Sequence, residues 1–208
     1  MNLSTIIQNF ELYVDDLTEL STAEETTLAN KIYHRICADR PWEFLKTSAT
    51  GTLSTSVPYV SLAADFSFFV PNTQYSDSVT NYDNSTAAVL VGANYTPYRI
   101  VNWSDRRQYR DQQGYAYLDL ANSRLYFTKQ PSTAESFEYD YIKVPADLTA
   151  SDEPVFPDRF HAMIYHGMAI EDDIIQRFDK ARSYAGENAA MYKKYLDDMA
   201  MWNARLQH

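Results

Sequence analysis

The sequence contains little cysteine and little glycine, and each shortage excludes a class of protein. Cys37 is its one cysteine, so the chain cannot form an internal disulfide, and its place on an apolar helical face indicates a reducing compartment. With 5 glycines there is little material for a dinucleotide fingerprint or a phosphate-binding loop, and neither motif is present. A Gly-x-Ser-x-Gly nucleophile elbow is also missing. We therefore find no signature of a nucleotide-binding enzyme or a serine hydrolase.

Basic charge and long apolar runs are scarce as well. The 18 Lys and Arg residues are outnumbered by 28 Asp and Glu, which leaves a net charge of −10. This balance argues against tight binding of nucleic acid to the whole surface, because neutralising phosphates requires clustered cations. No run approaches the roughly 18 apolar residues of a membrane span, and no basic and apolar leader opens the chain. We expect neither a membrane anchor nor export by a signal peptide.

Tyrosine, in contrast, is abundant. The chain has 17 Tyr, 10 Phe and 3 Trp, more than a modest core needs. Tyr tolerates burial at one end and water at the other, as protein interfaces require. It is equally common in β-strands, so both an interface role and a role within a sheet remain open.

The N-terminal part of the chain has helical periodicity. Residues 3–14 place apolar side chains at helical spacing and predict a short amphipathic helix. Ser21 followed by Glu24 has the spacing of a capping box and predicts the start of a second helix. That helix should end at Arg40-Pro41, because the residue before a proline resists the helical region.

The C-terminal part is also predicted to be helical. A third helix is expected from Asp158, and after a break near Gly186 an apolar stripe continues to the C-terminus.

Between the two ends the period changes to that of strands. Short runs of β-branched and aromatic residues are expected as strands at 47–53, 57–62, 87–91, 98–103, 115–120, 124–128 and 137–144. Asn122-Ser123 predicts a tight turn that joins two of these runs as a hairpin. Residues 71–85 are expected as an exposed loop, and residues 104–112 as one or two helical turns.

These patterns predict an α+β fold. We expect a helical bundle formed from both chain ends, at residues 1–45 and 146–208. It is interrupted in sequence by an inserted antiparallel β-sandwich or barrel-like module at residues 46–145, with its exposed loop near 71–85.

Polar side chains gather on the C-terminal helices without the spacing of a reactive site. His161 and His166 are about 140° apart around the helix axis, so they do not share a face as a zinc pair would. We interpret them as polar histidines on the helix face. The acidic runs 171–173 and 197–198 are interpreted as solvated helix faces, because adjacent residues diverge in direction. No catalytic residue, cofactor or metal site is expected.

Two groups of residues are candidates for contact with partners. They are Arg106, Arg107 and Arg110, and on the C-terminal stripe Tyr192, Tyr195, Met201, Trp202 and Arg205. The three clustered arginines suit an acidic surface of a neighbouring subunit, a DNA phosphate, or a solvated turn with local ion pairs. The stripe suits either core packing or docking. Met201 and Trp202 are adjacent and cannot both face one core, so one of them is a candidate for partner contact.

Short motifs follow one another in a set order along the chain. They are Arg40-Pro41-Trp42, Gly114 to Tyr117, Asn122 to Phe127, Phe137 to Tyr141, Val144 to Thr149, Pro154 to Pro157 and His166 to Ala169. In this order they resemble the head-to-tail adaptor proteins of tailed bacteriophages, also called head completion or connector proteins. The resemblance covers residues 1–45 and 98–205, whereas residues 46–97 match nothing in it.

The resemblance implies a structural virion protein without enzymatic activity or cofactors. Such adaptors form a ring, commonly dodecameric, under the portal protein. They extend the channel through which double-stranded DNA passes without specific binding, and they offer the next tail or nozzle component a docking surface. The implied location is the neck of the virion, between capsid and tail, after assembly in the host cytoplasm. We expect the terminal helices to meet the portal, while the β insertion faces neighbouring copies or the tail.

Two other functions remain open. One is a different tail component, such as a nozzle or tail-completion subunit. The other is a carbohydrate-binding module or hydrolase that stacks sugars on exposed aromatic rings. Its candidate residues are Tyr59, Tyr75, Tyr82, Tyr95 and Trp103. The absence of a close carboxylate pair on the strands argues against hydrolysis.

Overall fold

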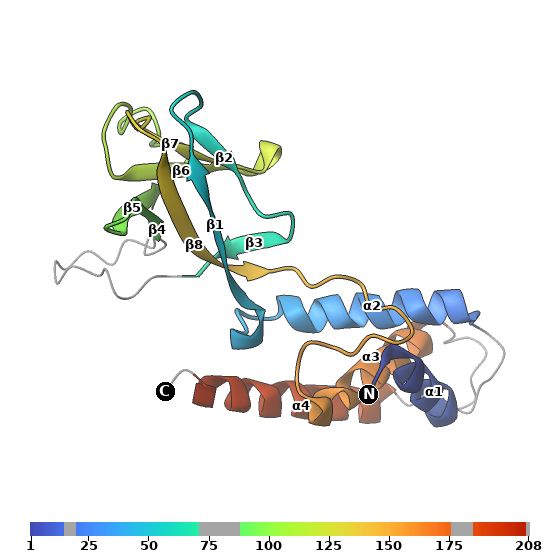
Figure 1. Cartoon of the computed structure of the whole chain (residues 1–208). Coiled ribbons are helices and arrows are strands. Elements are labelled where there is room, and N and C mark those ends of the chain that lie inside the picture. The colour runs from blue at the N-terminus through green and yellow to red at the C-terminus, as the bar shows by residue number, and fades with distance from the viewer. Residues whose placement is uncertain (15–19, 71–87, 176–184, 207–208) are drawn as a thin grey trace. The chain divides into compact units, whose positions relative to one another are not determined.

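The chain folds into a mixed α+β structure. The residues that the computed structural model describes are 1–14, 20–70, 88–175 and 185–206. The contacts divide the chain into a terminal-helix unit, Met1–Leu45 with Val144–His208, and a β unit, Lys46–Lys143. Within the described residues there are four α-helices and a nearly closed, barrel-like sheet (Figure 1). The predicted α+β class is confirmed.

Local sequence signals determine where the N-terminal helices begin and end. The helices of the terminal-helix unit are α1 (Leu3–Val14), α2 (Thr22–Ala38), α3 (Ala162–Ile175) and α4 (Ala185–Leu206). The predicted capping box begins α2, since the Ser21 hydroxyl accepts the Glu24 N–H, and the Glu24 carboxylate accepts the Ser21 N–H at 2.9 Å. After α2, the buried indole of Trp42 donates a 2.8 Å hydrogen bond to the carbonyl of Ile36. The Ile36 carbonyl lies in the last turn of α2 and also accepts the Asp39 N–H, so Trp42 reinforces the helix end.

The C-terminal helices differ slightly from the prediction. A 3₁₀ turn at Asp158–Phe160 comes first, and α3 begins only at Ala162, a common way for a helix to start. Helix α4 begins at Ala185, next to Gly186 and close to the predicted break, and residues 176–184 lie outside the described residues.

Helix α3 occupies the centre of the terminal-helix unit, because it contacts α1, α2 and α4. The close approach of α2 and of α4 to α3 depends on Gly167. A Cβ atom at this position would lie 2.5 Å from the Ile32 Cγ2 atom and 3.2 Å from the Tyr192 ring. Glycine therefore allows the three helices to meet at one point.

An irregular segment, here called the strap (residues 144–158), is fastened to α1 and α2. The Asn30 side chain accepts the Leu148 N–H at 2.7 Å and donates to the Leu148 carbonyl at 3.1 Å. The strap also accepts two N–H groups from the first turn of α1. Further along, the buried ring of Phe156 packs against Tyr33 and Phe44. Hydrogen bonds and an aromatic anchor thus hold a segment that has little regular secondary structure.

The β unit is one sheet of eight strands. They are β1 (Lys46–Leu53), β2 (Tyr59–Ser61), β3 (Phe66–Phe69), β4 (Ala88–Val91), β5 (Thr96–Val101), β6 (Tyr115–Asp119), β7 (Arg124–Phe127) and β8 (Glu135–Lys143). Their order is β1-β8-β4-β5-β6-β7-β2, and β3 pairs with β8 (Figure 1). The inner face carries a continuous apolar core of side chains from most of these strands. The unit therefore has a core of its own.

One strand pair departs from the expected antiparallel pattern. Strands β5 and β6 are parallel, whereas the other pairs between the described strands are antiparallel. A parallel pair needs a connection that runs from the end of one strand back to the end of the sheet where that strand began. Residues 102–114 make this connection as a series of turns, and the helical turns predicted there are wrong. Asp111 has a φ of 63°, which is incompatible with a continuing helix.

Strand β3 was not predicted, because its Phe-Ser-Phe-Phe sequence is only 4 residues long and does not alternate regularly between apolar and polar side chains. The predicted strand at 98–103 begins earlier, at Thr96, and ends at Val101. The loop predicted at 71–85 lies outside the described residues.

Candidate interaction surfaces

The three candidate arginines lie on the turn segment between β5 and β6 and have different surroundings. The guanidinium of Arg106 lies 4.1 Å from the centre of the Trp103 ring and donates to the Trp103 carbonyl. Arg107 is exposed. Arg110 is exposed too, with its Nε atom 3.7 Å from a carboxylate oxygen of Asp111. Arg106 is thus ordered against an aromatic ring, and its two neighbours face solvent.

Strand register aligns aromatic rings next to Arg106. Tyr117 on β6 lies opposite Tyr126 on β7, and Tyr126 lies opposite Tyr59 on β2. The rings of Tyr117 and Tyr126 are 5.3 Å apart and nearly parallel, and those of Tyr126 and Tyr59 are 5.1 Å apart. Trp103 extends the series with an edge contact to Tyr117 at 5.5 Å. We call these four side chains the aromatic row.

The aromatic row is polar at both ends and half-buried along its length. Arg124 on β7 places its guanidinium 4.2 Å from the centre of the Tyr59 ring, as Arg106 does at Trp103. Burial, and then the neighbouring Tyr126 hydroxyl, raise the pKa of Tyr117. Trp103 is 48% exposed and the tyrosines are half-buried. The aromatic row therefore presents apolar surface between two arginines, and each arginine side chain is held against a ring.

Sequence reasoning did not select Tyr117, Tyr126 or Arg124. The alternation of aromatic and core residues on the two strands of the predicted hairpin was the available signal, because it places Tyr117 and Tyr126 on one face. The partner at Tyr59 is distant in sequence, and only the sheet order reveals it.

The sugar-binding candidates are divided by the fold. Tyr59 and Trp103 belong to the aromatic row, whereas Tyr95 is exposed at the turn between β4 and β5. Tyr75 and Tyr82 lie outside the described residues. Trp103 and Tyr59 are the two candidates that lie in the aromatic row, and an arginine guanidinium covers one face of each ring. That arrangement weakens the case for a carbohydrate site.

The candidates on α4 face two directions. Trp202 packs inward against Phe44 and Phe160, with ring centres 6.2 Å and 5.9 Å away. Its neighbour Met201 is 56% exposed, and Arg205 is exposed on the same helix.

The two tyrosines of α4 contact α3. The ring of Tyr195 stacks on His166 with centres 5.9 Å apart, and the ring of Tyr192 lies against Gly167. Of the α4 candidates, Met201 and Arg205 are therefore the side chains available to a partner.

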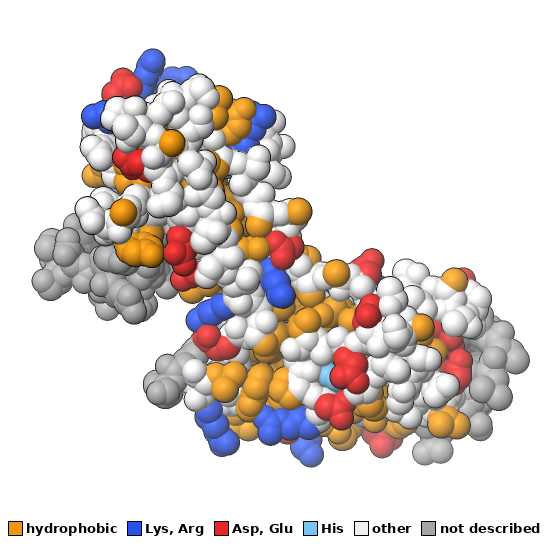
Figure 2. Space-filling view, viewed as in Figure 1, with side chains coloured by type: hydrophobic (Ala, Val, Ile, Leu, Met, Phe, Trp, Pro, Cys, Tyr) orange, Lys and Arg blue, Asp and Glu red, His pale blue; other side chains and the backbone are white. Residues whose placement is uncertain are grey.

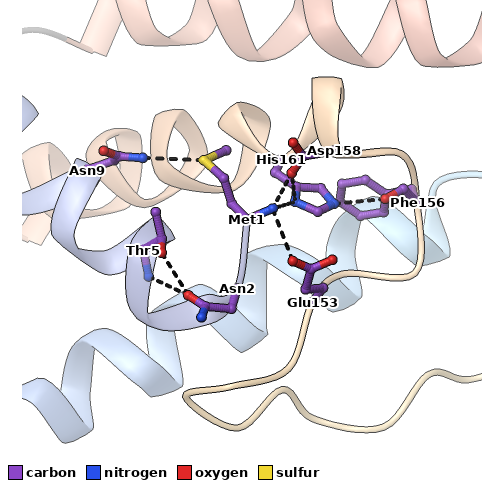
Figure 3. A network of polar contacts seen from close by, with 8 residues as sticks. All are labelled: Met1, Asn2, Thr5, Asn9, Glu153, Phe156, Asp158 and His161. Atoms are coloured by element: carbon purple, nitrogen blue, oxygen red, sulfur yellow. Dashed lines mark hydrogen bonds and ion pairs between the residues drawn. The ribbon is translucent and has the colours of Figure 1, made fainter.

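The interpretation of His161 as a polar histidine on the helix face is wrong, because its side chain is buried. Its Nε2 atom lies 2.8 Å from the carbonyl oxygen of Phe156, and its Nδ1 atom lies 2.9 Å from the N-terminal nitrogen of Met1 (Figure 3). The Met1 ammonium also pairs with the carboxylates of Asp158 and Glu153. This network ties the start of the chain to the strap.

The same interpretation is wrong for His166, which is 4% exposed. Its Nδ1 atom lies 2.9 Å from the Asn188 Oδ1 atom, and its ring contacts the rings of Tyr13, Tyr165 and Tyr195. Three helices enclose this histidine, so it is a structural residue of the core.

The acidic run on α3 is also not a solvated face. Asp172 is buried, and Glu171 accepts hydrogen bonds from Lys31 at 2.8 Å and Arg35 at 2.7 Å. These bonds lower the pKa of Glu171. The side chain of Asp173 is not among those that the structure describes. The cause of the error is that α3 is covered on several sides, which its own sequence does not show.

On α4, Asp197 is exposed and Asp198 is half-buried. In the part of the chain that the structure describes, no three His, Cys, Asp or Glu side chains gather as a metal-binding group. Helices with the length and apolar character of a membrane span are not found among the described residues.

The exposed aromatic rings and arginines are side chains that protein interfaces favour, which fits the class of structural interaction proteins. The family model described as SU10 adaptor protein matches residues 1–207, and the chain belongs to this family. No curated protein matches the chain. The predicted adaptor family is thus confirmed, and the protein is a structural adaptor of phage type.

Proposed function

We propose that this protein is a subunit of a head-to-tail adaptor ring that docks under the portal protein, extends the DNA channel and receives the tail or nozzle. The family match over nearly the whole chain is the observation that carries this proposal. The ring is proposed to be dodecameric and to occupy the neck of the virion, after assembly in the host cytoplasm. Its role is structural, without catalysis or cofactor, and double-stranded DNA passes through it without specific binding.

The proposal assigns different partners to the two parts of the chain. Residues 1–45 and 146–208 form the helical adaptor body that meets the portal, and the insertion at 46–145 faces neighbouring copies or the tail. Support for the first assignment comes from α4, where Met201 and Leu206 are more than half exposed and Arg205 lies between them in sequence. Exposed apolar side chains beside a cation suit a protein contact.

Substitution of the exposed α4 side chains tests portal docking. M201E/R205E should weaken binding to purified portal rings at least tenfold while leaving the thermal unfolding midpoint unchanged, because neither side chain packs in the core. A matched control is L120E, a change at a residue 65% exposed in the β unit, which should bind the portal normally. Normal portal binding by M201E/R205E would reject docking through this face.

Electron microscopy of intact particles tests the location itself. Density for this chain between capsid and tail is expected. Density further along the tail would instead identify a nozzle or tail-completion subunit.

A further inference from the structure

We propose that the aromatic row of the β unit binds the acidic strap of a neighbouring copy. This inference rests on the proposed ring and specifies which surfaces join its subunits. The row is Trp103, Tyr117, Tyr126 and Tyr59, with Arg106 and Arg124 at its ends. The contact is heterologous, because two different surfaces meet, and such contacts close into a ring when the rotation permits.

The end arginines are ordered before any partner arrives. Each guanidinium lies within 4.2 Å of a ring centre, a cation–π geometry that restricts the long side chain. A guanidinium has five N–H groups, so contact with a ring leaves some of them for further hydrogen bonds. Ordering the side chain in advance lowers the entropy lost when a carboxylate binds in bidentate fashion. The row is therefore suited to a partner that carries carboxylates.

Charge around the row favours the same partner. In a chain with a net charge of −10, the segment from β5 to β7 has more arginines than acids. Its arginines are Arg99, Arg106, Arg107, Arg110 and Arg124. Figure 2 shows basic and hydrophobic side chains next to one another on the visible face of the β unit. A cationic surface with exposed aromatic rings attracts an acidic protein surface and fixes its orientation.

The strap supplies such a surface on every copy. Almost all of the negative excess of the sequence lies in the terminal-helix unit, whose visible face carries several acidic groups (Figure 2). Within the strap, the side chains of Asp147, Glu153 and Asp158 are 78%, 66% and 73% exposed, so they remain accessible beside their contacts with His34 and the Met1 ammonium. Asp152 is exposed as well.

Bases of single-stranded DNA and sugars fit this surface less well. Both ligands bind by stacking on open ring faces. One face of each end ring is already occupied by a guanidinium of the same chain. A carboxylate does not need to displace the guanidinium, whereas a stacking ligand at that face does.

Site-specific photocrosslinking tests the contact in the full-length protein. Benzoylphenylalanine replaces Tyr126 or Tyr117, and equal amounts of chain labelled with ¹⁴N and ¹⁵N are assembled on portal rings. We expect crosslinks of mixed isotope composition to peptides that contain residues 147–158. Crosslinks confined to one isotope, to the portal, to a tail protein or to DNA would overturn the inference, as would the absence of crosslinks in assembled rings.

Charge reversal provides an independent readout. R106E/R124E and D147K/E153K should each reduce ring formation on the portal at least tenfold, and a chain carrying all four changes should recover most of it. K129E, at an exposed lysine beyond the end of β7, is the control and should form rings normally. Normal rings from R106E/R124E would overturn this interface and leave the adaptor function intact. Absence of the unaltered chain from the neck would instead refute the proposed function.

Discussion

At the scale of single residues, Gly167 and Gly186 form a natural pair for comparison. Gly167→Ala should destabilise the terminal-helix unit by about 1–3 kcal/mol, because the new Cβ lies 2.5 Å from Ile32 and overpacks a tight helix crossing. Thermal unfolding followed by circular dichroism measures the effect. Gly186→Ala is the control, since no atom lies within 4 Å of its Cβ position and alanine favours helix. Equal stability of the two variants would contradict the tight crossing.

Glu25 makes the stability of the protein dependent on pH. Burial, followed by the nearby Glu11 carboxylate, raises the pKa of Glu25 above its ordinary value of 4.5. The folded state then holds this proton more tightly than the unfolded state, so stability falls as pH rises from about 4.5 through the raised pKa. Glu25→Gln should therefore be more stable than the unaltered protein at pH 7, with the gain shrinking toward pH 4.

Urea unfolding at several pH values checks this prediction.

The contribution of Glu24 to stability should depend on pH in the opposite direction. Hydrogen bonds from Ser21 lower the pKa of Glu24, so its contribution is present above its ordinary pKa and lost as pH falls. Glu24→Gln should weaken the cap at pH 7. A loss of stability from Glu25→Gln at pH 7, or a gain from Glu24→Gln, would contradict the role described for that carboxylate.

At the scale of elements, one amide fastens the strap to α2. Asn30→Ala should cost about 1–3 kcal/mol of unfolding free energy, because the N–H and carbonyl of Leu148 both lose their partner. Urea denaturation measures the loss, and hydrogen exchange should show faster exchange of the Leu148 amide. Thr27→Ala is a suitable control on the exposed face of α2, where the hydroxyl bonds only to its own helix at 2.8 Å. A loss of the same size in both variants would remove the special role of Asn30.

At the scale of the whole molecule, the two units should respond differently to loss of the C-terminal helix. Removal of the chain from Met191 onward deletes Met199 and Asn203, which are buried, and Trp202, which packs on Phe44. We expect the terminal-helix unit to unfold while the β unit keeps its sheet, because the β unit has a separate core.

Far-ultraviolet circular dichroism and amide spectra of the truncated chain check this expectation. Helical signal should fall beyond the share of the deleted residues, and dispersed strand resonances should remain. Retained helices would show that α4 is dispensable for the unit. If they are lost as expected, failed portal binding by the truncated chain reflects unfolding, which makes M201E/R205E the more informative variant.

Part of the architecture was predictable because its signals are local. The capping box at Ser21, the stop at Arg40-Pro41 and the change from helical to strand-like period each depend on residues within a few positions of one another. They place α1 and α2 accurately and locate most strands. The adaptor family was also identified from short motifs, and the family match confirmed it.

The remaining features depend on which distant segments meet. Three helices bury His166, and the sequence of its own helix does not show that α1 and α4 cover its face. The aromatic row joins Tyr59 to Tyr126 and Tyr117 only because β2, β7 and β6 lie side by side in one register. Sequence alone determined most of the elements, since helix and strand propensities act over a few residues. Tertiary structure decided burial and the candidate surface, because both arise from contacts between residues far apart in the chain.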